Sequence, residues 1–493
     1  KIIFIIFLNL LMPFFEIIGI GSIPAFAVLI IDMDKFLSIL SSYISVDFLY
    51  QMTRTNLVIM AASGLALIFI IKNLYLFFVI YFQGSIIRKL RYETSLKLFK
   101  YYINLPYIEH KNKDPAVLIR TIEADILYSF VYIAANLTLI REALILFSIF
   151  MLLLVADPLI SSFTLILLGL PIILFYLFYR KILTKRGKIG QELMGKKFKT
   201  INQSLGLIKE TKILHRENFF FNNFAKITRE SENINFFTSL VTSTPRLFLE
   251  VLALVGVAVV CVVLISLGRS PDTILPIVSL LAISVVRFIP GLNAITASLT
   301  TIKFRKPSFG LIVKEINNLN LSKEENFKIN HEKEINLKNE IIIKDVSFDY
   351  KSENKSILNN INMKIKKSTS VGIIGRSGSG KSTLVDIILG LLEPKSGKIL
   401  VDGIDIKYNK HLWQKNIGYI PQDIYILDDT IKNNITFGIE EDKVDYKLLS
   451  ETIKVAQLET FVKFSKNKLD TIVGNRGTKI SGGEKQYKRK VVE

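Results

Sequence analysis

The chain has 493 residues, of which 50% are hydrophobic, and its mean hydropathy is +0.38. It is too long for a single core, and the apolar residues gather in the first three hundred positions, which excludes a large soluble enzyme and indicates a membrane protein. The net charge of +20 does not indicate nucleic-acid binding, because Lys, Asn and Ile are abundant throughout and the basic residues have a role in membrane orientation.

Six apolar stretches are each long enough to cross about 30 Å of hydrocarbon. They lie at residues 2–31, 56–83, 124–155, 158–180, 238–268 and 273–300. The first is not a cleaved signal peptide, since it is too long, contains Glu16 and has no small-residue cleavage site. The chain begins with Lys, so we expect further residues before it. The only cysteine, Cys261, lies in an apolar run where a packing role is expected.

Basic residues orient these spans. Residues 88–120 and 181–229 are dense in Lys and Arg, whereas the short joins near Asp157 and Ser270 are nearly free of them. By the positive-inside rule, the two basic segments are cytoplasmic. Between the first two spans, apolar residues recur every fourth position from Phe36 to Phe48. This pattern fits either a short amphipathic helix at the interface or an ordinary loop.

Several charged residues fall inside the predicted spans, where a charge is costly and tends to be functional. These residues are Lys72, Arg141, Glu142, Arg246, Glu250 and Arg287. Arg246 and Glu250 are four residues apart and can pair on one helix, whereas Lys72 and Arg287 have no local partner. Two interpretations stay open: snorkelling or pairing between helices, and a cationic patch in a translocation cavity suited to phosphate or pyrophosphate.

The composition changes after the last span. We expect a transmembrane domain at residues 1–304, a polar linker at 305–338 and a nucleotide-binding domain at 339–493. Residues 368–374 predict a short buried strand, and residues 382–390 predict a helix. Between them, residues 375–383 fit the pattern G-x-x-x-x-G-K-[ST], in which glycine N–H groups converge on phosphates at a helix start.

Within this loop, Lys381 supplies a positive charge and the Ser382 hydroxyl is a ligand for Mg²⁺. The residues expected to contact nucleotide are Gly375, Ser377, Gly378, Gly380, Lys381, Ser382 and Thr383. Tyr350 can stack on a base or lie on a sheet face. Gln422 follows a predicted strand end, and Ser481-Gly482-Gly483 offers backbone amides at a predicted helix start.

Together these motifs resemble an ATP-binding cassette (ABC) exporter of the half-transporter kind, over essentially the whole chain. The resemblance implies a membrane α-helical bundle of six helices followed by an α/β P-loop nucleotide-binding domain. It implies that Tyr350 stacks on adenine, that Gln422 contacts Mg²⁺, and that Ser481-Gly482-Gly483 closes on the ATP of the partner protomer. A homodimer that hydrolyses ATP follows from it. The six spans exclude a soluble nucleic-acid-associated ATPase.

Within exporters, residues 244–250 and 286–290 look similar to bacterial lipid-linked oligosaccharide flippases. That resemblance carries Lys72, Arg246 and Arg287 over as residues that hold the pyrophosphate of a polyprenyl-linked glycan. It implies the bacterial inner membrane, with the cassette in the cytoplasm. The alternatives are an exporter of drugs, lipid A-like lipids or peptides, and a nucleotide-gated channel or regulator on the same scaffold.

The sequence departs from the family after Gln486. The family has a strand ending in Asp-Glu there, and later a histidine, whereas this chain reads Tyr487 to Glu493 and stops. About ninety residues of the family pattern are therefore missing, and we name no catalytic glutamate. Glu493 does not stand in the required motif.

Overall fold

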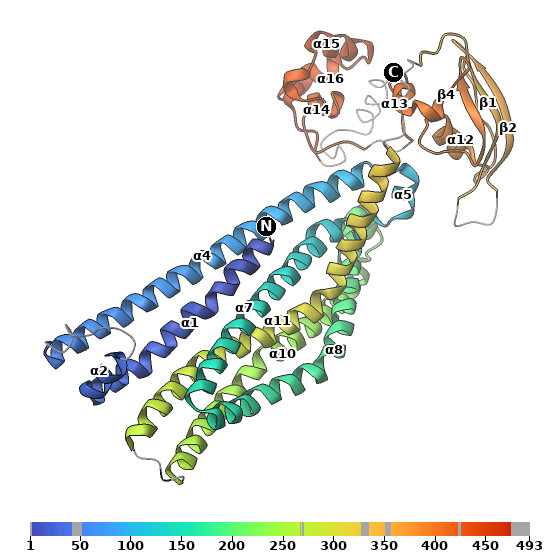
Figure 1. The fold of residues 1–493 in the computed structure, drawn as a ribbon. Helices are drawn as coiled ribbons and strands as arrows, with labels where there is room; N and C mark the ends of the chain where they lie inside the picture. The colour runs from blue at the N-terminus through green and yellow to red at the C-terminus, as the bar shows by residue number, and fades with distance from the viewer. Residues whose placement is uncertain are drawn as a thin grey trace. The chain divides into compact units, whose positions relative to one another are not determined.

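The computed structural model describes residues 2–41, 52–266, 268, 271–326, 335–350, 356–422 and 425–474. The chain divides into two compact units, residues 1–327 and 328–493. The first is helical throughout its described part, and the second combines a sheet with short helices (Figure 1).

Six helices of the described chain are long and apolar enough to cross a membrane, which confirms the prediction of six spans. They are α1 (Ile2–Ile31), α4 (Arg54–Ile103), α7 (Ile126–Ala156), α8 (Pro158–Gly206), α10 (Glu217–Ser266) and α11 (Pro271–Asn326). Three of them contain about 50 residues and extend well beyond the predicted span at their basic end. Many of their apolar side chains are exposed, as in Leu254, which is 76% exposed; this suits contact with lipid.

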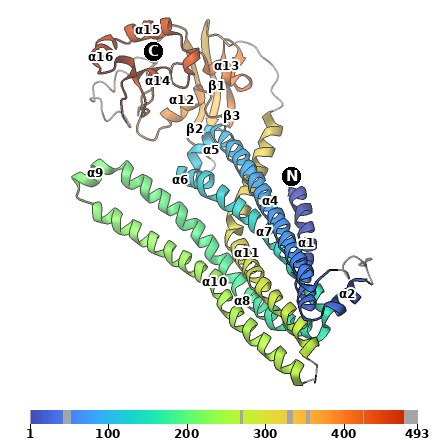
Figure 2. The ribbon, with the colours of Figure 1, turned by 90° about the vertical axis from the view of Figure 1, so that its left-hand side faces the viewer.

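Shorter helices join these spans. They are α2 (Met33–Ser41), α5 (Tyr107–Asn112), α6 (Pro115–Arg120), a π-helical turn (Thr121–Asp125) and α9 (Ile208–Ile213). Helix α9 forms the turn between α8 and α10, which run side by side (Figure 2). The predicted amphipathic segment is helical as far as Ser41, where Leu37 packs on Leu29 of α1 and Leu57 of α4. Its remainder, including Ile44 and Phe48, lies outside the described residues.

Helix α11 continues far into the stretch expected as a linker. Residues 305–326 are helical, and a polar linker from residue 305 is therefore not observed. The reason is an apolar stripe within the polar sequence: Ile312 and Leu319, seven residues apart, pack on Leu98 of α4 and Ile126 of α7. The boundary between the two units in the sequence therefore falls after residue 327, not at residue 305.

The second unit is built on a four-stranded antiparallel sheet with strand order β2-β1-β3-β4. The strands are β1 (Glu340–Phe348), β2 (Leu358–Lys366), β3 (Ser396–Val401) and β4 (Ile404–Asp405). Its helices are α12 (Lys381–Ile388), α13 (Lys410–Gln414), α14 (Ile431–Ile435), α15 (Tyr446–Val455) and α16 (Glu459–Phe464). Alternate apolar residues of β1, such as Ile341 and Ile343, are buried.

The buried strand predicted at residues 368–374 is wrong. This segment is not a strand, and Val371, Ile373 and Ile374 are 48%, 37% and 97% exposed. Residues 417–420, before Gln422, likewise form no strand. A central strand needs hydrogen-bonded neighbours and cover on both faces, and no described segment pairs with either stretch. Helix α12, by contrast, begins where the sequence predicts it.

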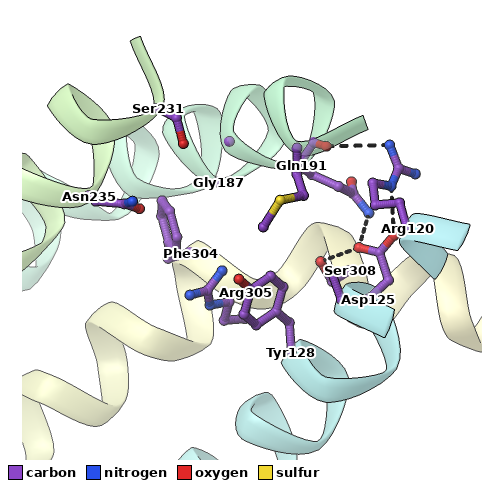
Figure 3. Close-up of a pocket in the computed structure, with 13 residues that line it drawn as sticks. Arg120, Asp125, Tyr128, Gly187, Gln191, Ser231, Asn235, Phe304, Arg305 and Ser308 are labelled. Carbon is purple, nitrogen blue, oxygen red and sulfur yellow. Dashed lines mark hydrogen bonds and ion pairs between the residues drawn. The ribbon is translucent and has the colours of Figure 1, made fainter. Parts of the chain in front are cut away.

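A buried carboxylate joins three elements of the first unit (Figure 3). Asp125, in the π-helical turn, is 1% exposed and pairs with Nε of Arg120 at 2.9 Å. Its other oxygen accepts hydrogen bonds from Gln191 of α8 at 2.8 Å and from Ser308 of α11 at 2.7 Å. We call these four residues the Asp125 clamp. It ties α8 and α11 to the start of α7.

Beside this clamp, α8 and α11 approach very closely around a cavity of about 60 Å³. A Cβ atom on Gly187 would lie 2.1 Å from the carbonyl oxygen of Phe304, so only glycine fits there. The guanidinium of Arg305 lies over the ring of Tyr128 at 3.6 Å. These contacts fix the mutual position of α7, α8 and α11 at their basic ends.

Gly187→Ala tests the close helix crossing. The new methyl group meets backbone atoms, so α8 and α11 must separate, at a cost of about 1–3 kcal/mol. We expect a lower melting temperature of the purified protein in detergent. Gly84→Ala is the matched control, because its Cβ meets nothing within 4 Å and Ala favours a helix. Equal melting temperatures for the two variants would contradict the crossing.

Asp125→Asn tests the clamp. The substitution keeps the shape but leaves the buried guanidinium of Arg120 without its counter-charge, which costs about 3–5 kcal/mol. We expect a large drop in melting temperature. Asp114→Asn is the control: Asp114 pairs with Lys199 at 3.1 Å, but its carboxylate is exposed to solvent and Asn also caps helix α6. A drop as large in Asp114→Asn would argue against a special role for Asp125.

Candidate functional site

The phosphate loop lies in the second unit, directly before α12. Gly378 and Gly380 have φ angles of +80° and +88°, values that favour glycine, and they turn the loop toward the start of the helix. A Cβ on Gly375 would lie 2.7 Å from the hydroxyl oxygen of Ser379 across the loop. The predicted glycines are therefore required by the backbone path itself. Ser377 lies between them and is exposed.

Lys381, the first residue of α12, reaches back over this loop. Its ammonium donates hydrogen bonds to the carbonyl oxygens of Gly375 and Arg376, both at 2.8 Å. The positive charge thus lies against the loop, next to the start of α12, where the first N–H groups have no partner within the helix. An anion bound there would gain both the ammonium and the helix N-terminus.

Tyr350 and Thr383 meet at the edge of the loop. Their hydroxyl oxygens are 3.4 Å apart, and the Tyr350 ring packs edge-on against Phe348 at the end of β1 with centroids 5.0 Å apart. Thr383 is buried, whereas the neighbouring Ser382 is exposed. Tyr350, which precedes Thr383 by 33 residues in the sequence, therefore lies beside the first turn of α12 in the structure.

The described structure does not test the two remaining predicted contacts. Gln422 is exposed and follows the unpaired stretch 417–420. Ser481-Gly482-Gly483 lies outside the described residues. In the described part of the chain, no group of three His, Cys, Asp or Glu side chains is arranged to hold a metal ion. A hydroxyl and an amide oxygen together with nucleotide phosphates are nevertheless a donor set that suits Mg²⁺, which usually takes few protein ligands.

A second cluster of functional groups lies among the helices of the first unit. Glu16 of α1 is 1% exposed, and its Oε1 lies 2.7 Å from Nε of Arg287 on α11. The ammonium of Lys72 on α4 lies 3.3 Å from both oxygens of the same carboxylate. The structure thus brings together two of the three cations predicted for a substrate cavity, and it does so through Glu16.

The cluster continues onto α7. Nη2 of Arg287 lies 3.5 Å from Oε2 of Glu142, and Oε1 of Glu142 lies 3.2 Å from Nε of Arg141. We call these five residues the buried charge chain: Lys72, Glu16, Arg287, Glu142 and Arg141. With three cations and two carboxylates, it carries one excess positive charge.

Arg246 is not seen in this chain of contacts. It pairs with Glu250 at 2.7 Å, one turn along α10, as the sequence spacing predicts. The two side chains are 63% and 44% exposed. This pair is thus far more exposed than the charges that surround Glu16.

Sequence reasoning did not assign Glu16 to the site. The residue was visible as a carboxylate inside the first span, and a charge there is already a sign of function. What sequence could not supply is the pairing, since Glu16 and Arg287 are 271 positions apart and meet only when α1 packs against α11.

Comparisons with known proteins agree with both units. Residues 358–490 match the family model described as ABC transporter. Over 149 residues, 30% of this chain, it is 42% identical to ABC transporter B family member 1 of Dictyostelium discoideum, covering 16% of that protein. Over 150 residues it is 34% identical to the ATP-dependent lipid A-core flippase of Vibrio parahaemolyticus, covering 26% of it.

The match therefore spans about a sixth to a quarter of the curated relatives' length. The fold comparison reaches further. A solved bacterial Atm1-family ABC exporter with ATP bound superposes with a TM-score of 0.69 at 18% identity, over 98% of this chain and 82% of that one. That similarity concerns the fold alone. Six long apolar helices are thus followed by a segment that matches the ABC transporter family model, and over nearly its whole length the chain has the fold of a solved ABC exporter.

Proposed function

We propose that the protein is an ATPase that drives transport across a membrane. The observation that carries this proposal is the loop of residues 375–383, where the ammonium of Lys381 lies against two loop carbonyls at the start of α12. The match of residues 358–490 to the ABC transporter family supports it. Catalysis rests on positioning the γ-phosphoryl group and neutralising its charge.

Each residue of the loop has a defined task in this proposal. Backbone N–H groups near Gly378 and Gly380 hold the phosphates, and Lys381 moves from its loop carbonyls onto the β- and γ-phosphates. Tyr350 stacks on the adenine. Ser382 and Gln422 hold Mg²⁺ together with the phosphates, and the ion supplies charge neutralisation when bound.

The active form in this proposal is a homodimer. Ser481-Gly482-Gly483 of one protomer completes the ATP site of the other, because a signature motif does not reach the phosphate loop of its own chain. ATP binding closes the two cassettes and hydrolysis reopens them, and the cytoplasmic loops transmit that motion to the spans. In a bacterium this places the protein in the inner membrane, with the cassette in the cytoplasm.

Lys381→Ala tests the ATPase assignment. Without the ammonium, the loop loses the positive charge that stabilises the transferred phosphoryl group. We therefore expect the ATP turnover rate to fall at least a hundredfold. Phosphate release from the reconstituted full-length protein measures this. Lys398→Ala is the control, because Lys398 is an exposed lysine on β3 of the same unit. An unchanged rate of ATP hydrolysis in Lys381→Ala would contradict the assignment of this loop as the ATPase site.

For the cargo, we propose a lipid-linked oligosaccharide with an anionic pyrophosphate. The buried charge chain supports this class, since an excess positive charge inside a membrane domain suits a phosphate-bearing headgroup. Its residues lie roughly fifteen positions from the helix ends opposite the basic segments, about 22 Å at 1.5 Å per residue. These positions fall near the middle of the predicted spans 2–31, 56–83, 124–155 and 273–300, so we place the buried charge chain near the midplane of the hydrocarbon core.

A second candidate is export of another lipid, a drug or a peptide. It is favoured by the similarity to a protein named a lipid A-core flippase. Both candidates use the same ATP site and differ in what the charge chain contacts. A channel or regulator on the same scaffold would bind ATP without coupling hydrolysis to movement of a lipid.

Arg287→Gln separates the candidates. Loss of this guanidinium removes a cation that is 24% exposed and meets both carboxylates of the chain, so we expect flipping of a fluorescent polyprenyl pyrophosphate glycan in liposomes to fall at least tenfold. Lys72→Gln should act in the same direction.

Arg246→Gln is the matched control for Arg287→Gln. It removes an Arg–Glu pair of the same 2.7 Å length, but one that is exposed on α10. If flipping is equally impaired in Arg246→Gln and Arg287→Gln, the buried charge chain is not the substrate site. If neither variant is impaired, the buried charge chain does not act on this lipid.

A further inference from the structure

Glu16 occupies both cations that the proposed function assigns to the substrate. Its Oε1 is 2.7 Å from Nε of Arg287 and 3.3 Å from Nζ of Lys72. A single carboxylate thus bridges two cations from different helices, which is the arrangement that an oxygen of a phosphate group would adopt between them.

The packing of α1 and α4 directs Lys72 toward Glu16. Gly19, one turn after Glu16, leaves room for the lysine stem, since a Cβ there would lie 3.3 Å from Cδ of Lys72. The ammonium then lies 4.8 Å from the centre of the Phe69 ring. Glycine on one side and the aromatic ring on the other hold the charged end of Lys72 beside the carboxylate.

Exposure differs sharply within this group. The side chain of Glu16 is 1% exposed, that of Lys72 is 11% exposed and that of Arg287 is 24% exposed. An anion that approaches from the accessible side therefore meets the guanidinium first, with the carboxylate behind it. The cation can change partner, while the glutamate stays buried.

Buried polar groups near the cluster have spare hydrogen-bonding capacity. The hydroxyl of Ser284, three residues before Arg287 on α11, and both amide atoms of Asn9, two turns before Glu16 on α1, are buried without a hydrogen-bond partner among the described residues. Such groups are rare in folded proteins and call for a partner such as an ordered water or an ion.

We propose that Glu16 is a built-in counter-anion, which holds Lys72 and Arg287 in the empty transporter and is displaced from them by the substrate's pyrophosphate. This inference rests on the proposed function, and it names Glu16 as the residue that sets affinity at that site. The carboxylate keeps two buried cations compensated between cycles, when they would otherwise be costly. It also competes with the substrate, so that the bound lipid can leave again.

Glu16→Gln is the decisive variant. Gln keeps the size and a hydrogen-bonding oxygen but removes the competing charge. We expect a fluorescent short-chain polyprenyl pyrophosphate glycan to bind about tenfold more tightly, and ATP-driven flipping to become slower because release is hindered. Tighter binding with slower turnover is a combination that a merely structural carboxylate does not produce.

Glu250→Gln is the matched control, since it neutralises a carboxylate at the same 2.7 Å from an arginine, outside the buried charge chain. Its affinity for the lipid should equal that of the wild type. Equal tightening in both variants would mean a general effect of net charge and would overturn the proposal, as would unchanged or weaker binding in Glu16→Gln.

Glu16→Asp covers the case in which Glu16→Gln does not fold. It keeps the negative charge but is one methylene shorter, so it cannot contact both cations, and we expect an intermediate gain in affinity. In that case unchanged affinity of Glu16→Asp overturns the proposal. If the wild type binds neither this lipid nor its monophosphate analogue, the proposed cargo fails. If the wild type binds and the Glu16 variants bind no more tightly, only the role of Glu16 fails.

Discussion

The pairing of charges inside the helical unit is the constraint on which the proposed transport function depends. A carboxylate or an ammonium in an apolar span is stable only with a partner, and Glu16 supplies that partner to two helices at once. Because Arg287 also meets Glu142, the pairing links α1, α4, α7 and α11 at one depth. The packing of these helices therefore depends on the same contacts that compensate the buried charges. In the proposed function, an anionic ligand that binds the cations replaces Glu16 as their partner.

In the second unit, the positive charge of Lys381 also has a partner within the protein, but that partner is the backbone rather than a side chain. Gly378 and Gly380 bend the chain so that α12 begins at the loop, and the ammonium of Lys381 is held by two carbonyl oxygens of the loop. Both candidate sites thus hold a cation on an internal partner, carbonyl oxygens in one case and a carboxylate in the other.

Much of this architecture is readable from sequence, for physical reasons. The spans follow from hydropathy, and the loop follows from a spacing that only a glycine turn before a helix satisfies. Contacts between distant residues are harder to predict: Arg287 lacks a local partner, and its partner Glu16 is 271 positions away. The strand predicted at 368–374 and the linker predicted from 305 were wrong because local pattern says nothing about available neighbours. The first has no paired strand, and the second finds Leu98 and Ile126 to pack on.

The most direct test of ATP-driven transport of an anionic lipid is the ATP hydrolysis rate of the reconstituted full-length protein, titrated with two lipids. One is a polyprenyl pyrophosphate glycan, and the other is the same glycan on a neutral polyprenol. If the proposed function is right and the buried cations bind pyrophosphate, the first lipid alone should give saturable stimulation. Equal stimulation by both lipids, or by neither, would contradict the proposed link between the buried charge chain and the ATP site.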